Sequence, residues 1–550
     1  MIRTIIIRRF KKFREFTFDL PGHIVLAGPN NTGKTTLLQA IATWSLALDV
    51  WKRRNDYNKR NGYVSVPLTR QLFPAVPLRA FDFLWHARDY RGRIIEIEAR
   101  GDGGWSVGME LAADSAEQIY VRPTVTTDAE VLRKHTLRAV YVPPMGGLGV
   151  DEPVLQPPKI AQLLGMGKVG DVVRNLLVEA HQNQPKWNTL VASVKEMFGY
   201  ELLPPDASGP DIMIEYRMAA GGPAYDVASA GSGFQQVLML LAFLNSRPGS
   251  VLLVDEPDAH LHVLLQDAIY GELKKVALRE GSQLVVATHS EVIINSVEPR
   301  ELCAVLNVPR PIADNIERNR LLMSLKVLTN QDIVMALSQP GVLYVEGHTD
   351  IALLKEWATT LGHPVAPLLA GGVFWKPTRW EAQPGRPGGL STDSRDHYEA
   401  IRLVREDLPG LEILDRDGNP NLPETELTGK GLQRVRWSRY EAESYLFHPD
   451  ALARFVEQRA GADSARNVED MKRYLQDNLP PAVLRDPLGD HDYLRQTKAR
   501  ESIIPPALEA AGFFGIPYTE YSAIAALMKP EEIHPEVREK LDAIQRAFRL

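Results

Sequence analysis

The stretch IVLAGPNNTGKTTLLQAIA, residues 24–42, decides the fold class of this chain. A short apolar run is followed by a loop that fits the pattern G-x-x-x-x-G-K-[ST], and the loop is followed by a helical pattern. The glycines let backbone N–H groups converge on phosphate oxygens, and the N-terminus of the helix adds its dipole. This order of strand, loop and helix predicts a nucleoside triphosphate site in an α/β fold.

The residues of the loop have distinct expected roles in binding ATP. Lys34 reaches the β- and γ-phosphates, and Thr35 ligates Mg²⁺. The other loop residues expected to contact the nucleotide are Gly28, Asn30, Asn31, Gly33 and Thr36.

A second apolar run, VLLVDEP at residues 251–257, ends in two carboxylates. It is typical of a buried strand that delivers both groups at its C-terminal end. Asp255 is expected to hold the Mg²⁺ of the bound ATP, and Glu256 to orient or deprotonate the attacking water.

Two further stretches resemble ABC ATPases. The strand QLVVATHS, residues 283–290, places His289 where these proteins have a switch histidine that faces the γ-phosphate. The stretch SAGSGFQQ, residues 229–236, resembles the ABC signature, which implies that Ser232 and Gly233 contact ATP bound by a second subunit. Phe234 departs from the pattern, because glycine is common there. The alternative interpretation is a Gly/Ser stretch that only caps a helix.

Residues 1–300 resemble the ATPase head shared by SMC, RecF-like and OLD (overcoming lysogenization defect) proteins. The interval between the ATP motifs is too short for the long coiled coil of an SMC protein, and EPDAHLHVLLQ at residues 256–266 is similar to the OLD form of the motif. The resemblance implies a homodimer or a larger even-numbered oligomer. A helical insertion at about residues 155–205 either adds an oligomer contact or packs on its own head.

Two strand patterns later in the chain also end in carboxylates. VLYVEGHTD, residues 342–350, carries Glu346 and Asp350, and LEILDRDGN, residues 411–419, carries Asp415 and Asp417. Residues i and i+2 of an extended chain point to the same side, so the two aspartates are expected to converge. If the strands are neighbours in a parallel sheet, the carboxylates form an oxygen-rich site suited to Mg²⁺ or Mn²⁺.

Strand–Glu–Gly followed by strand–D-x-D is similar to the Toprim pattern of topoisomerases, primases and OLD nucleases. The resemblance implies that Glu346 is a general acid/base or a metal ligand and that Asp415 and Asp417 are metal ligands. It also implies Asp350 as a ligand of a second metal, and Lys529 as a candidate for a C-terminal lysine of OLD nucleases.

Three features of this second site stay open. Glu441 and Glu443, in RYEAESYLFHP, either complete the site or face solvent. DRDGNPNLPETE, residues 415–426, also resembles a calcium loop, although Pro420 stands where such a loop needs glycine. Both strands could also end in solvated acidic turns. The basic stretch RVRWSR, residues 434–439, is a candidate nucleic-acid contact in which Trp437 stacks on a base.

The chain has 550 residues, too many for a single hydrophobic core. We predict an ABC-type ATPase domain over residues 1–340, a Toprim domain with a parallel α/β sheet over 341–450, and a helical C-terminal region over 451–550. Residues 5–20, IIIRRFKKFREFTFDL, predict a β-hairpin around a basic turn.

Composition limits the function classes. The net charge of -6 argues against a protein that coats nucleic acid over its whole surface, but it allows a local basic groove. The single cysteine, Cys303, cannot supply the zinc ribbon of a bacterial primase. No apolar run approaches the roughly 20 residues of a membrane span, and the N-terminus lacks a signal-peptide pattern, so we expect a cytoplasmic protein.

The resemblance as a whole implies an ATP-hydrolysing, metal-dependent endonuclease of the OLD type in bacterial anti-phage defence. DNA is favoured over RNA as its nucleic-acid partner, and a helicase or another defence protein is a candidate protein partner. The alternative is an ATPase sensor or scaffold that binds a phage trigger or DNA and controls a partner effector, with a Toprim domain that no longer cuts. The second site argues against a RecF-like repair ATPase.

Overall fold

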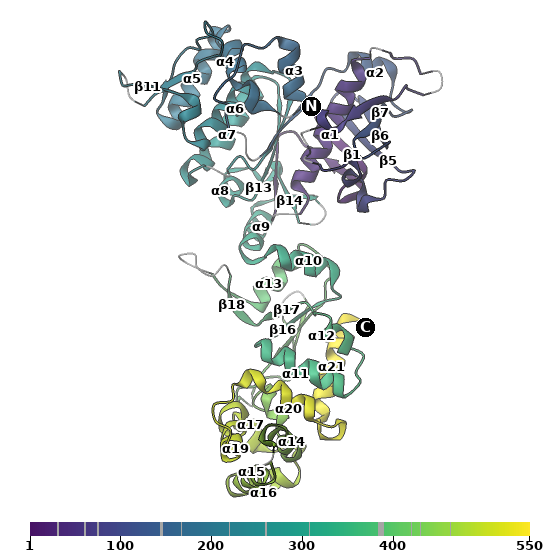
Figure 1. The fold of residues 1–550 in the computed structure, drawn as a ribbon, viewed down its shortest axis with the longest axis vertical. Coiled ribbons are helices and arrows are strands. Elements are labelled where there is room, and N and C mark those ends of the chain that lie inside the picture. Colours follow the sequence, from purple (N-terminus) through teal and green to yellow (C-terminus); the bar gives the residue numbers. More distant parts are fainter. Residues whose placement is uncertain are drawn as a thin grey trace. The chain divides into compact units, whose positions relative to one another are not determined.

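The computed structural model forms two compact units, Met1–Leu322 and Met323–Leu550 (Figure 1). The residues that the structure describes are 1–29, 32–54, 56–59, 62–73, 76, 78–143, 147–166, 168–218, 221–258, 261–306, 309–382, 390–419, 421–428, 431–461 and 464–550.

The first unit contains a six-stranded antiparallel sheet. The predicted hairpin is confirmed, because β1 and β2 pair antiparallel around the basic turn. The strands run in the order β2 (Phe13–Asp19), β1 (Ile2–Phe10), β5 (Ile94–Gly101), β6 (Ser106–Ala113), β7 (Gln118–Pro123) and β4 (Val66–Thr69).

A second sheet of the first unit carries the ATP motifs. It runs in the order β15 (Pro309–Pro311), β14 (Leu302–Val305), β3 (Ile24–Ala27), β13 (Gln283–Thr288), β12 (Val251–Asp255) and β8 (Ala139–Val142). All pairs are parallel except β14–β15. Because β3, β13 and β12 are consecutive neighbours, the three motifs that follow them meet at one edge of the sheet.

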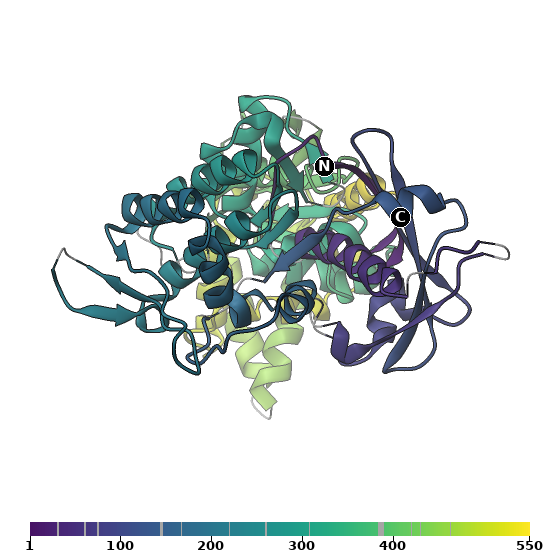
Figure 2. The ribbon, with the colours of Figure 1, turned by 90° about the horizontal axis from the view of Figure 1, so that it is seen from above.

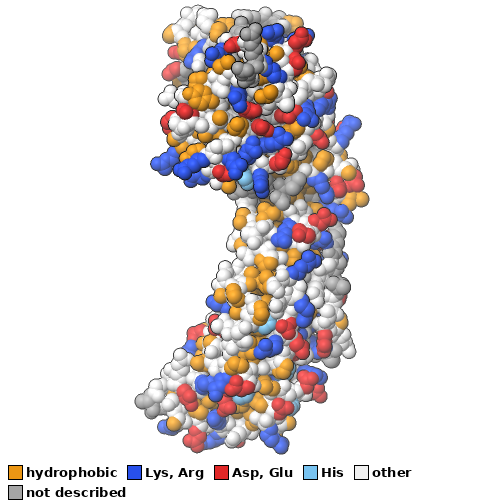
Figure 3. Space-filling model, turned by 90° about the vertical axis from the view of Figure 1, so that its right-hand side faces the viewer, with side chains coloured by type: hydrophobic (Ala, Val, Ile, Leu, Met, Phe, Trp, Pro, Cys, Tyr) orange, Lys and Arg blue, Asp and Glu red, His pale blue; other side chains and the backbone are white. Residues whose placement is uncertain are grey.

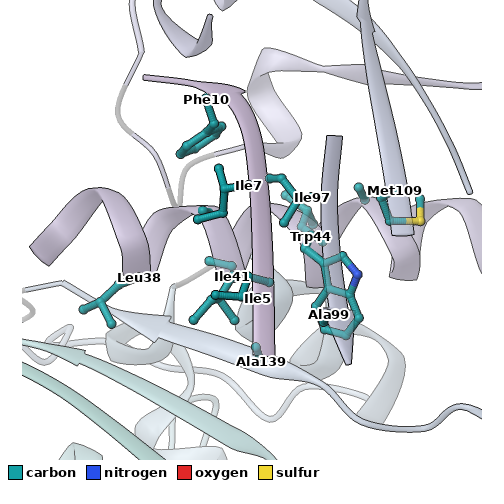
Figure 4. Close-up of a cluster of buried hydrophobic side chains, with 14 of the residues drawn as sticks. Ile5, Ile7, Phe10, Leu38, Ile41, Trp44, Ile97, Ala99, Met109 and Ala139 are labelled. Carbon is teal, nitrogen blue, oxygen red and sulfur yellow. The ribbon is translucent and has the colours of Figure 1, made fainter. Parts of the chain in front are cut away.

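Helix α1 (Lys34–Lys52) joins the two sheets, because it contacts strands of both. Figure 4 shows Leu38, Ile41 and Trp44 of this helix among Ile5 and Ile97 of the antiparallel sheet. Nearly every α1 side chain from Leu37 to Leu48 is buried, so the helix is apolar on all sides rather than amphipathic. This core fixes the N-terminus of α1, where the nucleotide loop ends.

Most of the remaining elements of the first unit form a mainly helical lobe, consistent with the predicted helical insertion. Helices α4 and α5 pack on α6, so the insertion covers its own head; an oligomer contact there stays a prediction. The β10–β11 hairpin extends from this lobe in Figure 2. The elements of the lobe are α3 (Pro157–Gly165), α4 (Val173–His181), α5 (Gln184–Phe198), β9 (Glu201–Leu202), β10 (Glu215–Arg217), β11 (Ala224–Asp226), α6 (Ser232–Ser246), α7 (Val263–Arg279) and α8 (Glu291–Ser296). Helix α2 (Ala129–Lys134) lies instead beside β6 of the antiparallel sheet (Figure 1).

The second unit contains a five-stranded sheet in the order β17 (Trp375–Pro377), β16 (Val342–Val345), β20 (Gly410–Leu414), β22 (Leu432–Arg436) and β21 (Thr425–Thr428). Only the β21–β22 pair is antiparallel. The predicted strands β16 and β20 are therefore direct parallel neighbours. A separate pair, β18 (Arg379–Ala382) and β19 (Leu390–Asp393), is antiparallel.

One hydrophobic core joins this sheet to the C-terminal helices. The division of the chain therefore differs from the predicted one: it falls after Leu322, and residues 341–450 and 451–550 share one unit. The helices are α9 (Asn315–Val327, across the division), α10 (Asn330–Ser338), α11 (His348–Thr360), α12 (Ala366–Ala370), α13 (Ser394–Ile401), α14 (Pro449–Ala460), α15 (Ser464–Asn478), α16 (Pro481–Arg485), α17 (Asp492–Gln496), α18 (Ala499–Ser502), α19 (Ile504–Ala510), α20 (Ser522–Leu527) and α21 (Pro535–Phe548).

Candidate active sites

The nucleotide loop depends on its two glycines. Gly33 has a φ of 115°, a conformation that side chains rarely adopt. A β-carbon on Gly28 would clash with the carbonyl oxygen of Val305 on the neighbouring strand β14. The loop therefore needs glycine at both positions for reasons visible in this fold. Asn30 and Asn31 lie outside the described residues.

Lys34 is buried within this loop. Its Nζ donates hydrogen bonds to the carbonyl oxygens of Gly28, at 2.6 Å, and Pro29, at 2.8 Å. Burial lowers the pKa of the Lys34 ammonium, and the nearby carboxylates of Glu256 and Asp255 oppose that shift. The ammonium is thus held inside the loop, where phosphate oxygens would replace the two carbonyl groups.

The carboxylates of Asp255 and Glu256 lie in different environments. Asp255 is buried, and its Oδ2 accepts a hydrogen bond from the Tyr141 hydroxyl at 2.9 Å. Burial raises the pKa of Asp255, and the hydroxyl groups of Thr35 and Tyr141 oppose that shift. The effect of Thr35 places it beside Asp255, as a shared Mg²⁺ requires. Tyr141 carries no sequence signal for this role.

Glu256 and His289 face each other across strands β12 and β13. His289 Nδ1 lies 3.3 Å from Glu256 Oε1. This hydrogen bond lowers the pKa of Glu256 and raises the pKa of His289. Glu256 has a φ of 49°, a strained conformation for a non-glycine residue, and its N–H donates to the carbonyl of Ala287 at 2.8 Å. The turn directs the carboxylate toward the switch-histidine position.

Further side chains of the stretch EPDAHLHVLLQ connect the ends of strands β12 and β13. Thr288 Oγ1 donates to Asp258 Oδ1 at 2.6 Å, and Ser290 Oγ donates to Gln266 Oε1 at 2.8 Å. Gln266 Nε2 donates in turn to the carbonyl of Leu261 at 3.0 Å. The distal glutamine of EPDAHLHVLLQ therefore fixes the loop after β12 to the loop after β13.

The signature-like stretch begins helix α6. Gly231 precedes the helix, and Ser232 is exposed at its N-terminus. Phe234 is buried against the rings of Phe198, Tyr200 and Tyr216, with centroid separations of 5.1, 5.2 and 5.3 Å. The departure from glycine thus has a packing reason. No side chain caps the N-terminus of α6, and a helix N-terminus of this kind can bind an anion.

The second site lies at the carboxyl ends of β16 and β20. The N–H of Asp415 donates to Glu346 Oε1 at 3.3 Å, so the two predicted strands bring these residues together. Asp350 Oδ2 accepts the N–H groups of Glu346, at 2.9 Å, and Gly347, at 3.1 Å. Burial raises the pKa of Asp350 to about 7, and the Glu443 carboxylate adds to the shift. Part of the Asp350 side chain therefore caps helix α11.

The prediction that Asp415 and Asp417 lie on an extended stretch of chain is wrong. The chain turns after β20, and Asp417 has a φ of 50° and an exposed side chain. The N–H groups of Arg416 and Asp417 both donate to the carbonyl of Tyr440, at 3.1 and 3.0 Å. Asp417 still lies close enough to Glu346 to raise the pKa of that carboxyl, although burial is the main cause.

Glu441 and Glu443 do not face solvent. Their exposed fractions are 1% and 2%, and one carboxylate oxygen from each lies within 4.8 Å of an Asp415 oxygen and of the other. Burial raises the pKa of Asp415 well above its usual range, and the carboxylates of Glu346, Asp350 and Glu443 add to the shift. Burial also raises the pKa of Glu441 to about 7. Such a cluster cannot be fully ionised without a nearby cation.

Sequence reasoning missed Arg500, the cation beside this cluster. Its backbone N–H donates to Glu441 Oε1 at 2.6 Å, and its guanidinium lies 3.8 Å from Glu441 and 3.9 Å from Glu443. The guanidinium also lies 5.5 Å from the Tyr518 ring centroid. Lys529 is exposed, and its N–H caps a turn by donating to Glu532.

The expectation that Trp437 of RVRWSR stacks on a base is wrong. Trp437 is 2% exposed and packs in the core, so it cannot stack on a base. Arg434 pairs with Glu412 at 2.6 Å, and buried Arg439 donates to the carbonyl groups of Ser444 and Pro487. These side chains hold the unit together.

Charges are interspersed on the face of the molecule in Figure 3. On the antiparallel sheet, three arginines each have a carboxylate partner within 2.7 Å, in the pairs Arg8–Glu96, Arg100–Glu98 and Arg122–Glu110. These three pairs neutralise part of the positive charge on this sheet.

Comparisons with known families match the first unit. Residues 4–72 match a family model described as "AAA domain", and residues 166–295 match one described as "AAA domain, putative AbiEii toxin, Type IV TA system". The first match contains the nucleotide loop, and the second contains the signature-like stretch, the acidic strand and His289. The nucleotide motifs of the first unit are therefore similar to those of AAA-type ATPase domains. No curated protein matches the chain.

Solved SMC heads are also similar to this chain. The SMC head domain from Thermotoga maritima is 13% identical and matches over 57% of this chain and 99% of its own, with a TM-score of 0.33. An SMC head with an extended coiled coil, bound to the C-terminal domain of ScpA from Pyrococcus furiosus, is 13% identical over 58% and 97%, with a TM-score of 0.36.

Among the described residues, no helix has both the length and the apolar character needed to cross a membrane.

Proposed function

We propose that this chain is an ATP-regulated, metal-dependent nuclease of the OLD type, in which the second unit is a Toprim domain. The observation that carries the proposal is the cluster of half-buried Asp415 with buried Glu441 and Glu443, which lies beside Glu346 at the carboxyl edge of a parallel sheet. Burying ionised carboxylates is unfavourable unless a cation neutralises them, and a bound divalent cation would do so.

The donor set of this cluster fits Mg²⁺ or Mn²⁺. All ligand atoms are carboxylate oxygens, which hard divalent cations prefer. Glu443 Oε1 is buried and has no hydrogen-bond partner among the described residues; Arg500 Nη1 lies 3.9 Å away, so this oxygen can coordinate a cation. When bound, the metal supplies charge to polarise a phosphodiester and lowers the pKa of a coordinated water.

The protein side chains have separate roles in this proposal. Asp415, Glu441 and Glu443 hold the metal, and Asp417 and Asp350 are candidates for a second one. Glu346 lies at the mouth of the cluster with a raised pKa, which suits a general acid/base. Arg500 is half-buried beside the same carboxylates, where its guanidinium can bind the scissile phosphate and stabilise charge that develops on it.

The first unit is proposed to bind ATP with Mg²⁺ through Lys34, Thr35 and Asp255, and to hydrolyse it with Glu256 and His289. Ser232 and Gly233 would contact ATP on a second copy of the chain, giving a homodimer or a larger even-numbered oligomer. ATP binding would then control access of nucleic acid, with DNA favoured over RNA, to the second unit.

A role in anti-phage defence is part of the proposal. The description of one matched family names a toxin of a toxin–antitoxin system, which supports such a role. We expect the enzyme to act in the cytoplasm, where phage nucleic acid lies, with a helicase or another defence protein as a candidate partner.

A cleavage assay tests the function. Supercoiled plasmid, linear DNA and tRNA are incubated with the intact chain in Mg²⁺, Mn²⁺ or EDTA, with and without ATP. We expect at least one substrate to be cut in the metal but not in EDTA. ATP hydrolysis without cleavage of any substrate would contradict the nuclease and favour an ATPase sensor that controls a partner effector.

A further inference from the structure

The signature-like end of α6 is held by an ion pair between buried Arg174 and half-buried Asp226. Asp226 precedes a short 3-10 helix, Val227–Ser229, that leads into α6. Asp226 Oδ1 accepts the N–H of Ala228 at 2.7 Å, and the Asp226 carbonyl accepts the Ser229 hydroxyl at 2.6 Å. The position of Asp226 thus sets the path of the chain just before Ser232 and Gly233.

Arg174, the second residue of α4, binds both oxygens of this carboxylate. Nη1 and Nη2 donate to Asp226 Oδ2 and Oδ1, each at 2.8 Å, in a two-pronged pairing. The arginine is 1% exposed. Its remaining hydrogen bonds go to the carbonyl groups of Ile212, Gly149 and Val150, at 3.1, 3.3 and 3.2 Å. Lysine cannot make this set of contacts, because it lacks a planar fork of donors.

The same pair connects the signature to the strand beside the ATP site. Gly149 and Val150 lie in the segment after β8, and Tyr141 of β8 binds Asp255. Gln235 makes a second connection: its Oε1 accepts the N–H of Leu148 at 3.2 Å, and its Nε2 donates to the carbonyl of Ala230 at 2.9 Å. The segment after β8 and the signature-like end of α6 are therefore tied together twice.

We propose that Arg174 is a positioning residue of the ATPase, which holds Asp226 and thereby sets the N-terminus of α6 for ATP bound by a second copy of the chain. The inference rests on the proposed head-to-head dimer. A site completed across two subunits needs accurate placement, since a displacement of about 1 Å can cost about 10²-fold in rate. Because no side chain caps the N-terminus of α6, its position depends on the preceding segment, which Arg174 and Asp226 hold.

The test compares Arg174→Lys and Asp226→Asn with Glu179→Gln. Glu179 of α4 and Arg247 at the C-terminal end of α6 also form a two-pronged ion pair, away from the signature. We expect Arg174→Lys and Asp226→Asn to bind a fluorescent ATP analogue with wild-type affinity, because Lys34 and Asp255 are unchanged. Their kcat should fall by about 10- to 100-fold, with weaker ATP-dependent self-association in sedimentation. Glu179→Gln should keep the wild-type kcat.

Mixing variants separates positioning from a general loss of structure. Lys34→Ala removes a subunit's own phosphate contact but keeps its signature, whereas Asp226→Asn does the reverse. Their mixture should hydrolyse ATP faster than either variant alone, because one site of a mixed dimer is complete. A mixture of Lys34→Ala with Glu256→Gln should not recover, since both changes damage the same half-site.

The outcomes distinguish the inference from the proposed function. If the wild-type chain hydrolyses ATP and self-associates, but Arg174→Lys and Asp226→Asn match it or lose no more than Glu179→Gln, the inference is overturned and the dimeric ATPase stands. Failure of the Lys34→Ala and Asp226→Asn mixture to recover overturns it as well. A wild-type chain that neither hydrolyses ATP nor self-associates overturns the proposed function, and the inference with it.

Discussion

Glu256→Gln is expected to lower the rate of ATP hydrolysis by about 10²- to 10⁴-fold while ATP still binds. The carboxylate follows strand β12 next to buried Asp255, the proposed Mg²⁺ ligand, and it faces His289 at 3.3 Å. Glutamine has almost the same shape but cannot accept a proton from the attacking water. Phosphate release measures hydrolysis, and a fluorescent ATP analogue measures binding.

The assigned role of Glu256 also predicts a change in self-association. Slow hydrolysis should preserve the proposed ATP-bound dimer. Glu256→Gln should therefore self-associate more strongly in ATP than the wild type does. Glu298→Gln is the control, since Glu298 is more than half exposed and pairs with Arg300 on the surface. Wild-type hydrolysis by Glu256→Gln would refute the assigned role.

Asp415→Asn is expected to reduce nucleic-acid cleavage by at least about 10²-fold without changing ATP hydrolysis. Asn can still accept the N–H of Ala442, which lies 2.9 Å from Asp415 Oδ1, so the local fold should survive. The change removes one negative charge from the buried cluster and weakens its hold on a divalent cation. Cleavage is measured at several Mn²⁺ concentrations, on the substrate that the cleavage assay with plasmid, linear DNA and tRNA identifies.

Asp407→Asn provides the matched control. Asp407 lies in the same unit, its side chain is 82% exposed, and it pairs with Arg405 on the surface. This variant should cut like the wild type. Equal cleavage by Asp415→Asn and the wild type at all Mn²⁺ concentrations would show that the cluster is not the cutting site.

The nucleotide site is largely predictable from sequence because its signals are local. The loop, the strands before it and after it, and the acidic pair each occupy a few consecutive residues. The parallel order of β3, β13 and β12 then brings them together without further information. Tyr141 could not be predicted, since its contact with Asp255 depends on β8 and β12 being neighbours.

The second site is less predictable from sequence, because the positions of its side chains depend on a turn and on burial by distant parts of the chain. Neighbouring strands β16 and β20 join Glu346 and Asp415 as expected, but the turn at Asp417 and Gly418 ends the extended geometry assumed for D-x-D. The sequence cannot tell whether Glu441 and Glu443 are buried, because their cover comes from a helical region that the same core joins to the sheet. Arg500 belongs to that region and has no local motif.

The same reasoning explains the error at residues 434–439. The arginines of this stretch predict a basic surface only as long as the carboxylates that pair with them are unknown. Glu412 on the adjacent strand β20 neutralises Arg434, and the C-terminal helix α21 supplies Lys540, whose ammonium lies 5.5 Å from the Trp437 ring centroid.

The central claim is that the buried carboxylates of the second unit bind a divalent metal, and Mn²⁺ binding followed by electron paramagnetic resonance tests it most directly. The titration is done without nucleotide, on the wild type, on Glu443→Gln and on Lys34→Ala. We predict that the wild type and Lys34→Ala bind Mn²⁺ alike, and that Glu443→Gln binds it at least about tenfold more weakly. Equal binding by the wild type and Glu443→Gln, or no binding by the wild type, would contradict the claim.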